Sequence, residues 1–249
     1  MVAWSTAPIQ FEPGGWRLDF RRDLRLAVAK LPLQQRRSLS ATYTSAVSEG
    51  ADVENLLIYN VFNAEMSQAA RDGFTFERIQ GVPPDCPMPL SSQALCRYEY
   101  RLVGDQPTSL EAEGQVLASS RFELPARVPE SPTVVWYAAK IAGVVAARGC
   151  DATRPWGILI SMRVPYSSHI TCSSIVKPFI DGIASALHFH DGSDIGYLSR
   201  QLGAHLGLND GALVKALLLD DTNAVFGKAR LLCRHKNSVQ WNPGDEHCI

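Results

Sequence analysis

The sequence lacks the features that mark membrane and exported proteins. No apolar run approaches the roughly 18 residues that a membrane-spanning helix needs, so no membrane partner is expected. The N-terminal residues have neither a basic start nor an apolar core, so they do not resemble a signal peptide. These absences predict a soluble, cytoplasmic protein.

A strong charge of one sign is also missing. The 249 residues carry a formal net charge of −1 at pH 7, so the whole molecule has no field that would attract nucleic acid. Any such affinity must come from a local basic patch. There is no glycine-rich phosphate loop either, since Gly203–Gly207 lacks both the lysine and the spacing of one.

Cysteines are few and scattered. The chain has 6 of them and no export signal, so they are predicted to be free, buried thiols. Apolar residues make up 46% of the chain and charged residues 20%, as in a globular protein that can bury a core. This length suits one large domain or two of about 120 residues each.

Hydrophobic periodicity predicts the elements before residue 104. Apolar residues recur near helical spacing over 16–30, and clean alternation predicts a strand over 95–103. A Ser- and Thr-rich strand is expected over 38–47. A helix is expected over 52–70, with Asp52 at its N-cap.

A polar, acidic and proline-containing stretch at 104–132 is predicted to be a linker. The elements expected beyond it are helices over 133–148, 176–189, 194–206 and 210–218, strands over 157–164 and 229–234, and an irregular tail. Helices and strands in this order predict an α+β fold made of two tandem lobes, 1–103 and 133–249.

The two predicted lobes can be overlaid without a gap at a spacing of 123 residues. In this overlay Asp52–Leu57 falls on Ile175–Ile180, and each segment is expected to open a helix. The overlay predicts a tandem duplication with similar helix-strand-helix-strand topology in both lobes. Lys177 stands where the first lobe has an acid, so the polar chemistry is expected in one lobe only. Lys177 and Asp181 are spaced for an i,i+4 ion pair.

Asp52 and Glu54 are two carboxylates at the expected start of a helix. Such a pair can bind one divalent cation such as magnesium, which prefers carboxylate oxygens and keeps waters for a phosphate substrate. Asn55 beside them can orient a ligand. The alternative is structural: Asp52 caps the helix, Glu54 interacts with its dipole, and Asn55 is solvated.

The segment Asp52–Leu56 follows a predicted helix and strand, and it resembles the Asp-x-Asp-Asn-Leu motif of the RusA-like Holliday junction resolvases. Those are small α+β, magnesium-dependent nucleases that act as symmetric dimers on branched DNA. The resemblance implies a metal-dependent endonuclease, with Asp52 and Glu54 as catalytic and metal-binding residues. Asn55 would then take part in binding nucleic acid.

The chain departs from that family at several positions. Glu54 replaces the usual Asp, and Ile58 stands at the family's basic position. The third acid would have to be Asp72 or Glu77. Under the resemblance, the second lobe would be degenerate and without a site, which favours binding over the two cuts that junction resolution needs.

A basic stretch precedes the acidic motif. Arg21, Arg22 and Arg25 are predicted to hold the phosphates of nucleic acid. Two alternatives stay open: the arginines form the solvated side of an amphipathic helix, or they bind an acidic protein partner.

The histidines offer an alternative metal site. His188, His190 and Asp191 could supply imidazole and carboxylate ligands to a transition metal. The helix expected over 176–189 would, however, direct the two imidazoles apart.

Two functions therefore follow from the sequence. The first is nucleic-acid binding or magnesium-dependent phosphodiester cleavage by a RusA-like protein. The second is a non-catalytic protein-interaction or assembly subunit that uses the same fold.

Overall fold

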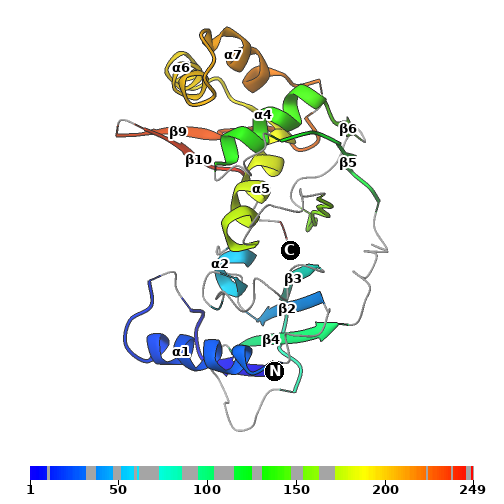
Figure 1. Cartoon of the computed structure of the whole chain (residues 1–249), viewed down its shortest axis with the longest axis vertical. Coiled ribbons are helices and arrows are strands. Elements are labelled where there is room, and N and C mark those ends of the chain that lie inside the picture. The colour runs from blue at the N-terminus through cyan, green and yellow to red at the C-terminus, as the bar shows by residue number, and fades with distance from the viewer. Residues whose placement is uncertain are drawn as a thin grey trace, which may run out of the picture.

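The computed structural model contains helices and strands together, which confirms the predicted α+β class (Figure 1). The residues that it describes are 1–9, 12–31, 38–46, 52–58, 61, 73–85, 95–103, 115–124, 131–146, 154–162, 172–222, 224–236, 238–244 and 248. Over these ranges no helix is both long enough and apolar enough to cross a membrane.

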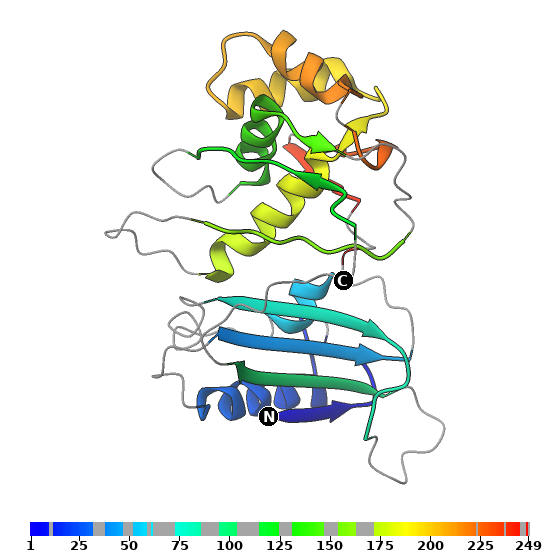
Figure 2. The ribbon, with the colours of Figure 1, turned by 90° about the vertical axis from the view of Figure 1, so that its right-hand side faces the viewer.

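A four-stranded sheet organises the chain before residue 104. The elements there are β1 (Val2–Ser5), α1 (Trp16–Ala29), β2 (Ser38–Ser45), α2 (Val53–Leu57), β3 (Phe74–Gln80) and β4 (Cys96–Val103). The strand order is β1-β4-β2-β3, with β2 and β3 parallel and the other pairs antiparallel. The chain passes through α2 between the two parallel strands, as parallel pairing requires a crossover (Figure 2).

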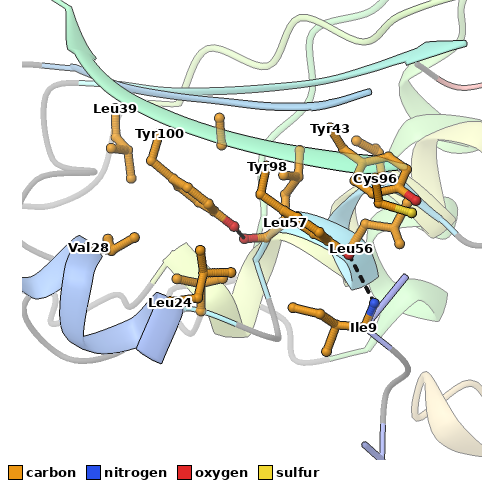
Figure 3. Close-up of a cluster of buried hydrophobic side chains, with 13 residues drawn as sticks. Ile9, Leu24, Val28, Leu39, Tyr43, Leu56, Leu57, Cys96, Tyr98 and Tyr100 are labelled. Carbon is orange, nitrogen blue, oxygen red and sulfur yellow. Dashed lines mark hydrogen bonds between the residues drawn. The ribbon is translucent and has the colours of Figure 1, made fainter. Parts of the chain in front are cut away.

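One face of this sheet carries the core of the first part. The side chains of Tyr43 on β2 and of Tyr98 and Tyr100 on β4 lie on the same face of the sheet, against which α1 and α2 pack (Figure 3). Their hydroxyl groups are satisfied: that of Tyr100 donates to the Leu57 carbonyl at 2.8 Å, and that of Tyr98 accepts from the Ile9 amide at 2.9 Å. The Tyr100 bond ties α2 to the sheet and so sets where the acidic motif lies.

Helix α1 forms as its amphipathic pattern predicts. Leu24 and Val28, one turn apart, are buried against the sheet, and Phe20 packs beside them. Burying such side chains contributes about 1.5–3 kcal/mol each. The arginines therefore occupy the remaining sides of the helix.

The chain after residue 115 forms helices and short two-stranded sheets. Its elements are β5 (Ala118–Ser119), α4 (Pro132–Ala142), β6 (Val145–Ala146), α5 (Cys172–Ala186), β7 (His188–His190), α6 (Ile195–His205), α7 (Gly211–Leu219), β8 (Gly227–Ala229), β9 (Leu232–His235) and β10 (Ser238–Trp241). The sheets pair β5 with β6, β7 with β8, and β9 with β10. Trp136, Leu198, Leu218 and Leu231 are fully buried in the largest cluster of this part.

Close helix packing holds α4 against α5. Gly182 has no side chain to separate the helices: a Cβ there would lie 2.6 Å from Val135 Cβ and 2.8 Å from the Pro132 carbonyl oxygen. Helix α5 is therefore fixed against α4 along the part of its length that follows Lys177.

Several expected elements differ from the structure. The helix predicted over 133–148 ends at Ala142, because Gly143 takes a positive φ of 77° that terminates it. Within the strand predicted over 157–164, the described residues 157–162 pair with no strand, and a strand needs a neighbour to form a ladder. The tail was expected to be irregular, yet it contains β10, while β1 and β3 were not predicted at all.

The tandem duplication is not confirmed. At a spacing of 123 residues β3 coincides with α6, so strand is overlaid on helix there. The boundaries 1–103 and 133–249 stay a prediction. Within the predicted linker 104–132, β5 pairs with β6.

Candidate functional site

The acidic motif lies at the start of α2. Asp52 is the N-cap residue, as predicted, and its carbonyl accepts from the amides of Asn55 at 3.0 Å and Leu56 at 3.2 Å. Its side chain makes no capping bond. Val53, Leu56 and Leu57 are buried in the core beneath, which fixes the orientation of this short helix. The described helix ends at Leu57, and most of the predicted range to 70 lies outside the described residues.

A lysine from the second part of the chain meets this motif. Lys177 Nζ on α5 donates to Glu54 Oε1 at 2.9 Å and to Asp52 Oδ2 at 3.2 Å. It also donates to Asp181 Oδ1 at 3.2 Å, the i,i+4 pair that the sequence predicts. An ammonium has three N–H donors, and each has a carboxylate acceptor here. We call these four side chains the Lys177 cluster.

The Lys177 cluster is largely withdrawn from water. The side chain of Glu54 is 1% exposed and that of Asp181 is 10% exposed, while Lys177 and Asp52 keep 34% and 28%. Charges this deeply placed lose much hydration, so the ion pairs offset a desolvation cost rather than add stability freely. The cluster opens to solvent on the side of Lys177 and Asp52.

Burial sets the direction of the pKa shift for two acids of the cluster, Asp181 and Glu54. It raises the pKa of Asp181 to about 6, although the Lys177 ammonium acts to lower it. Burial likewise raises the pKa of Glu54 against the opposing effect of Lys177. For Lys177, burial acts to lower the pKa, but the carboxylates of Glu54 and Asp181 outweigh it and the pKa is raised. Three carboxyl groups share one ammonium, so proton uptake by the buried acids relieves their repulsion.

Asn55 supports the acidic pair directly. Its side-chain amide donates to Asp52 Oδ2 at 3.0 Å, on the same oxygen that accepts from Lys177. This contact orients the Asp52 carboxylate toward the lysine. The predicted role of Asn55 in binding nucleic acid stays a prediction.

The predicted metal ligands thus converge on a cation, and that cation is an ammonium group. Magnesium would need the oxygens of Asp52 and Glu54 that Lys177 now occupies. Over the part of the chain that the structure describes, no group of three or more His, Cys, Asp or Glu side chains has the arrangement to hold a metal ion. A metal at this point requires that Lys177 first move away.

The third acid of the cluster is not one of the two proposed from the sequence. Asp72 lies outside the described residues. Glu77 pairs with Thr42 in the sheet register, so it lies on the face opposite Tyr43 and away from α2. Asp181 takes the third position instead. Its spacing from Lys177 was the only signal in the sequence, and spacing alone does not reveal a contact with a distant helix.

The arginines lie on α1, and Figure 1 shows this helix at the end of the molecule away from α5. Arg22 is exposed and forms ion pairs with Asp19 at 3.2 Å and Asp23 at 3.6 Å. Arg21 and Arg25 are half-buried, and burial together with the charge of Arg21 lowers the pKa of Arg25.

The alternative histidine site is built differently from the prediction. His188 and His190 lie on strand β7, not at a helix end, because this segment pairs with β8. Both side chains are buried. The ring of His190 accepts from the Gly192 amide at Nδ1, at 2.9 Å, so its Nε2 donates to the Leu232 carbonyl at 3.3 Å. The Asp191 carboxylate accepts from Ser193, and these bonds lower its pKa. His190 and Asp191 are thus already engaged with protein groups.

A groove of about 700 Å³ runs along α4. Phe122, Tyr137 and Ile141 give it an apolar lining, and Arg121 and His205 are among its polar residues. None of the residues predicted from the sequence lines it. The groove therefore lies apart from the Lys177 cluster and from the histidine site.

No protein-family model, curated protein or solved structure matches this chain. The RusA-like resemblance therefore stays a prediction. What the described residues establish is the geometry of the Lys177 cluster.

Proposed function

We propose that the protein is a non-catalytic protein-interaction or assembly subunit, in which the RusA-like acidic motif joins two parts of one molecule. The supporting observation is the Lys177 ammonium, which contacts Asp52 and Glu54 directly. An ammonium and a magnesium ion repel one another, so the same oxygens do not hold both. Asp52 and Glu54 then have a structural role, and a protein partner binds elsewhere on the surface of the molecule.

The surface best suited to a partner is the arginine side of α1. Arg22 on this side is exposed, and Arg21 and Arg25 are half-buried, so three positive charges are gathered on one helix. Carboxylates on a partner would be attracted to these charges, and complementary charge also speeds association. The proposed partner is therefore an acidic protein surface.

The second candidate is the metal-dependent endonuclease. It is favoured by one observation: Asp52, Glu54 and Asp181 converge on a single cation. In that function Lys177 would leave, magnesium would take its place, and Arg21, Arg22 and Arg25 would hold phosphates. The metal would activate water and stabilise the charge that develops on the phosphodiester.

Metal binding and DNA cleavage separate the two candidates. We expect calorimetry to detect no Mn²⁺ binding by the wild type and binding by Lys177→Met, whose three carboxylates lose their ammonium. A matched control is Lys228→Met, since Lys228 is exposed on β8. Magnesium-dependent cleavage of branched DNA by the wild type, abolished by Asp52→Asn with Glu54→Gln, would overturn the proposal.

Binding of an acidic partner to the arginine side of α1 can be tested separately. Charge reversal of Arg21→Glu with Arg25→Glu is expected to abolish binding to an immobilised polyglutamate peptide. Asp52→Asn with Glu54→Gln is expected to leave that binding unchanged. The opposite outcome is that the wild type binds branched DNA but not polyglutamate, and that charge reversal abolishes the DNA binding. This outcome would support the nucleic-acid function.

A further inference from the structure

Strands β9 and β10 pair as a two-stranded antiparallel ribbon, which Figure 1 shows extending to one side of the molecule, beyond α4. Residues that lie directly opposite one another in such a pair share a face, so the register gives the ribbon two faces. The inner face carries Leu232, Arg234, Val239 and Trp241, and the outer face carries Cys233, His235, Ser238 and Gln240.

The inner face fixes the ribbon to the rest of the molecule. Leu232 is buried, and Val239 and Trp241 pack against the same hydrophobic cluster. Nearer the end of the ribbon, the guanidinium carbon of Arg234 lies 4.7 Å from the centre of the Tyr197 ring on α6, a cation–π contact. The ribbon is thus held in place through one face, and the other face points to solvent.

The outer face is polar. His235, Ser238 and Gln240 are exposed, and their imidazole, hydroxyl and amide groups can each donate and accept hydrogen bonds. The four residues that the structure places on this face include no aliphatic, Phe, Tyr or Trp side chain. Protein partners are commonly anchored by such apolar and aromatic side chains. The outer face therefore suits a ligand that is itself polar.

Positive charge accompanies this polar face. Between Ala229 and Trp241 the chain has no Asp or Glu, but it has three cationic residues, Arg230, Arg234 and Lys236. All three are exposed. Arg230 forms an ion pair with Asp194 at 3.5 Å, in which both side chains stay more than half exposed, at 55% and 52%. The ribbon is therefore a local basic patch on a molecule whose net charge is −1, and phosphate groups are the complementary ligand.

The dimensions of the ribbon fit the major groove of DNA. That groove is about 12 Å wide and admits a two-stranded ribbon, whose strands lie about 4.8 Å apart. Base edges in the groove present donors and acceptors that Gln and Ser side chains match. Duplex RNA does not offer this site, because its major groove is too deep and narrow for side chains to read.

We propose that the β9–β10 ribbon is a DNA-binding element: its outer face enters the major groove of duplex DNA, and the cationic residues beside it contact the phosphates. Figure 1 shows the ribbon and α1 in different parts of the molecule. The inference therefore goes beyond the acidic partner proposed for α1 and does not depend on it.

Fluorescence anisotropy with the full chain tests the proposal. The probes are a short labelled DNA duplex of mixed sequence and an RNA duplex of the same sequence, each titrated between about 50 and about 200 mM salt. The DNA duplex is expected to bind at least about fivefold more tightly than the RNA duplex, because only the DNA groove allows contacts with base edges.

Two variants separate phosphate contacts from groove contacts. Lys236→Gln is expected to reduce the slope of log affinity against log salt by about 1, as loss of one phosphate contact does. Lys215→Gln on α7 is the matched control, since Lys215 is exposed, and it should leave the slope unchanged. Ser238→Ala with Gln240→Ala removes no charge, so it should keep the slope and lose the preference for DNA over RNA.

Three outcomes would overturn the proposal. The first is that the wild type binds no DNA duplex, or binds DNA and RNA duplexes equally. The second is DNA binding that Arg21→Glu with Arg25→Glu abolishes and that Lys236→Gln leaves unchanged, since the DNA would then be held on α1. The third is binding of polyglutamate, without DNA, that Lys236→Gln weakens, which would give the ribbon an acidic protein as its partner.

Discussion

At the scale of single residues, Lys177 decides the chemistry of the acidic motif. Asp52 and Glu54 have the residue types and spacing of a divalent-cation site, but the cation they meet is an ammonium. Glu54 is 1% exposed, so its carboxylate depends on a cationic partner for compensation. Removing the partner leaves a buried charge that water does not reach.

Lys177→Met is therefore expected to lower the free energy of unfolding near neutral pH. The expected loss is about 2–3 kcal/mol. Removing one partner of a fully buried ion pair costs roughly 3–5 kcal/mol, and the loss here is smaller because Lys177 and Asp52 are partly solvated. The loss should shrink below about pH 5, since the acids, with raised pKa values, take up protons and no longer need the ammonium.

Urea denaturation of the wild type and of Lys177→Met at several pH values measures this effect. Lys228→Met, at an exposed lysine, should change stability by no more than about 0.5 kcal/mol. An equal loss at acid and neutral pH would show that Lys177 contributes through packing of its methylene groups and not through charge.

At the scale of elements, the position of Lys177 depends on how α5 packs on α4. Gly182 allows the two helices to approach, because a Cβ would lie 2.6 Å from Val135 Cβ. The Pro132 carbonyl oxygen, at 2.8 Å from the same point, belongs to the backbone and has little freedom to move aside. The contact thus leaves no room for a methyl group.

Gly182→Ala is expected to lower the free energy of unfolding by about 1–3 kcal/mol, despite the better helix propensity of alanine, because the helices must separate. The matched control is Gly196→Ala on α6, where a Cβ would have Arg200 Nη1 as its nearest neighbour at 3.9 Å. That change should be neutral or stabilising by up to about 1 kcal/mol. Thermal unfolding of the two variants gives the comparison, and a stable Gly182→Ala would contradict the close contact.

At the scale of the whole molecule, separate cores are joined through a polar cluster. Leu39 belongs to the core beneath the sheet and Leu231 to the largest core of the second part. Among the residues that the structure describes, these two clusters share none, so a defect in one is not expected to spread through packing into the other.

Leu39→Ala is expected to increase amide hydrogen exchange in the strands before residue 104 and to leave α6 and α7 unchanged. Leu231→Ala is expected to do the reverse, each change costing about 2–5 kcal/mol in its own part. Hydrogen exchange read by mass spectrometry resolves the two parts. Equal acceleration across the whole chain in either variant would mean that it unfolds as a single cooperative unit.

Local features of the site and fold were predictable from the sequence. Lys177 and Asp181 pair as their i,i+4 spacing predicts, and Asp52 begins α2 as its residue type predicts. The histidines at 188 and 190 were placed wrongly, because a short apolar segment after a helix has no periodicity that distinguishes strand from helix. Asp181 was not recognised as the third acid, because the other two acids of the cluster, Asp52 and Glu54, are remote from it in the chain.

The sequence by itself determined the α+β class and the elements with strong periodicity, among them α1, β4, α6 and α7, because each depends on residues a few positions apart. Only the tertiary structure decided what the acidic motif meets. Lys177 reaches Glu54 across 123 positions and Asp52 across 125, and the packing of α5 on α4 and of α2 on the sheet brings them together. Burial and pairing of charge arise from that packing, so the same two carboxylates that suggest a metal site are held by a lysine.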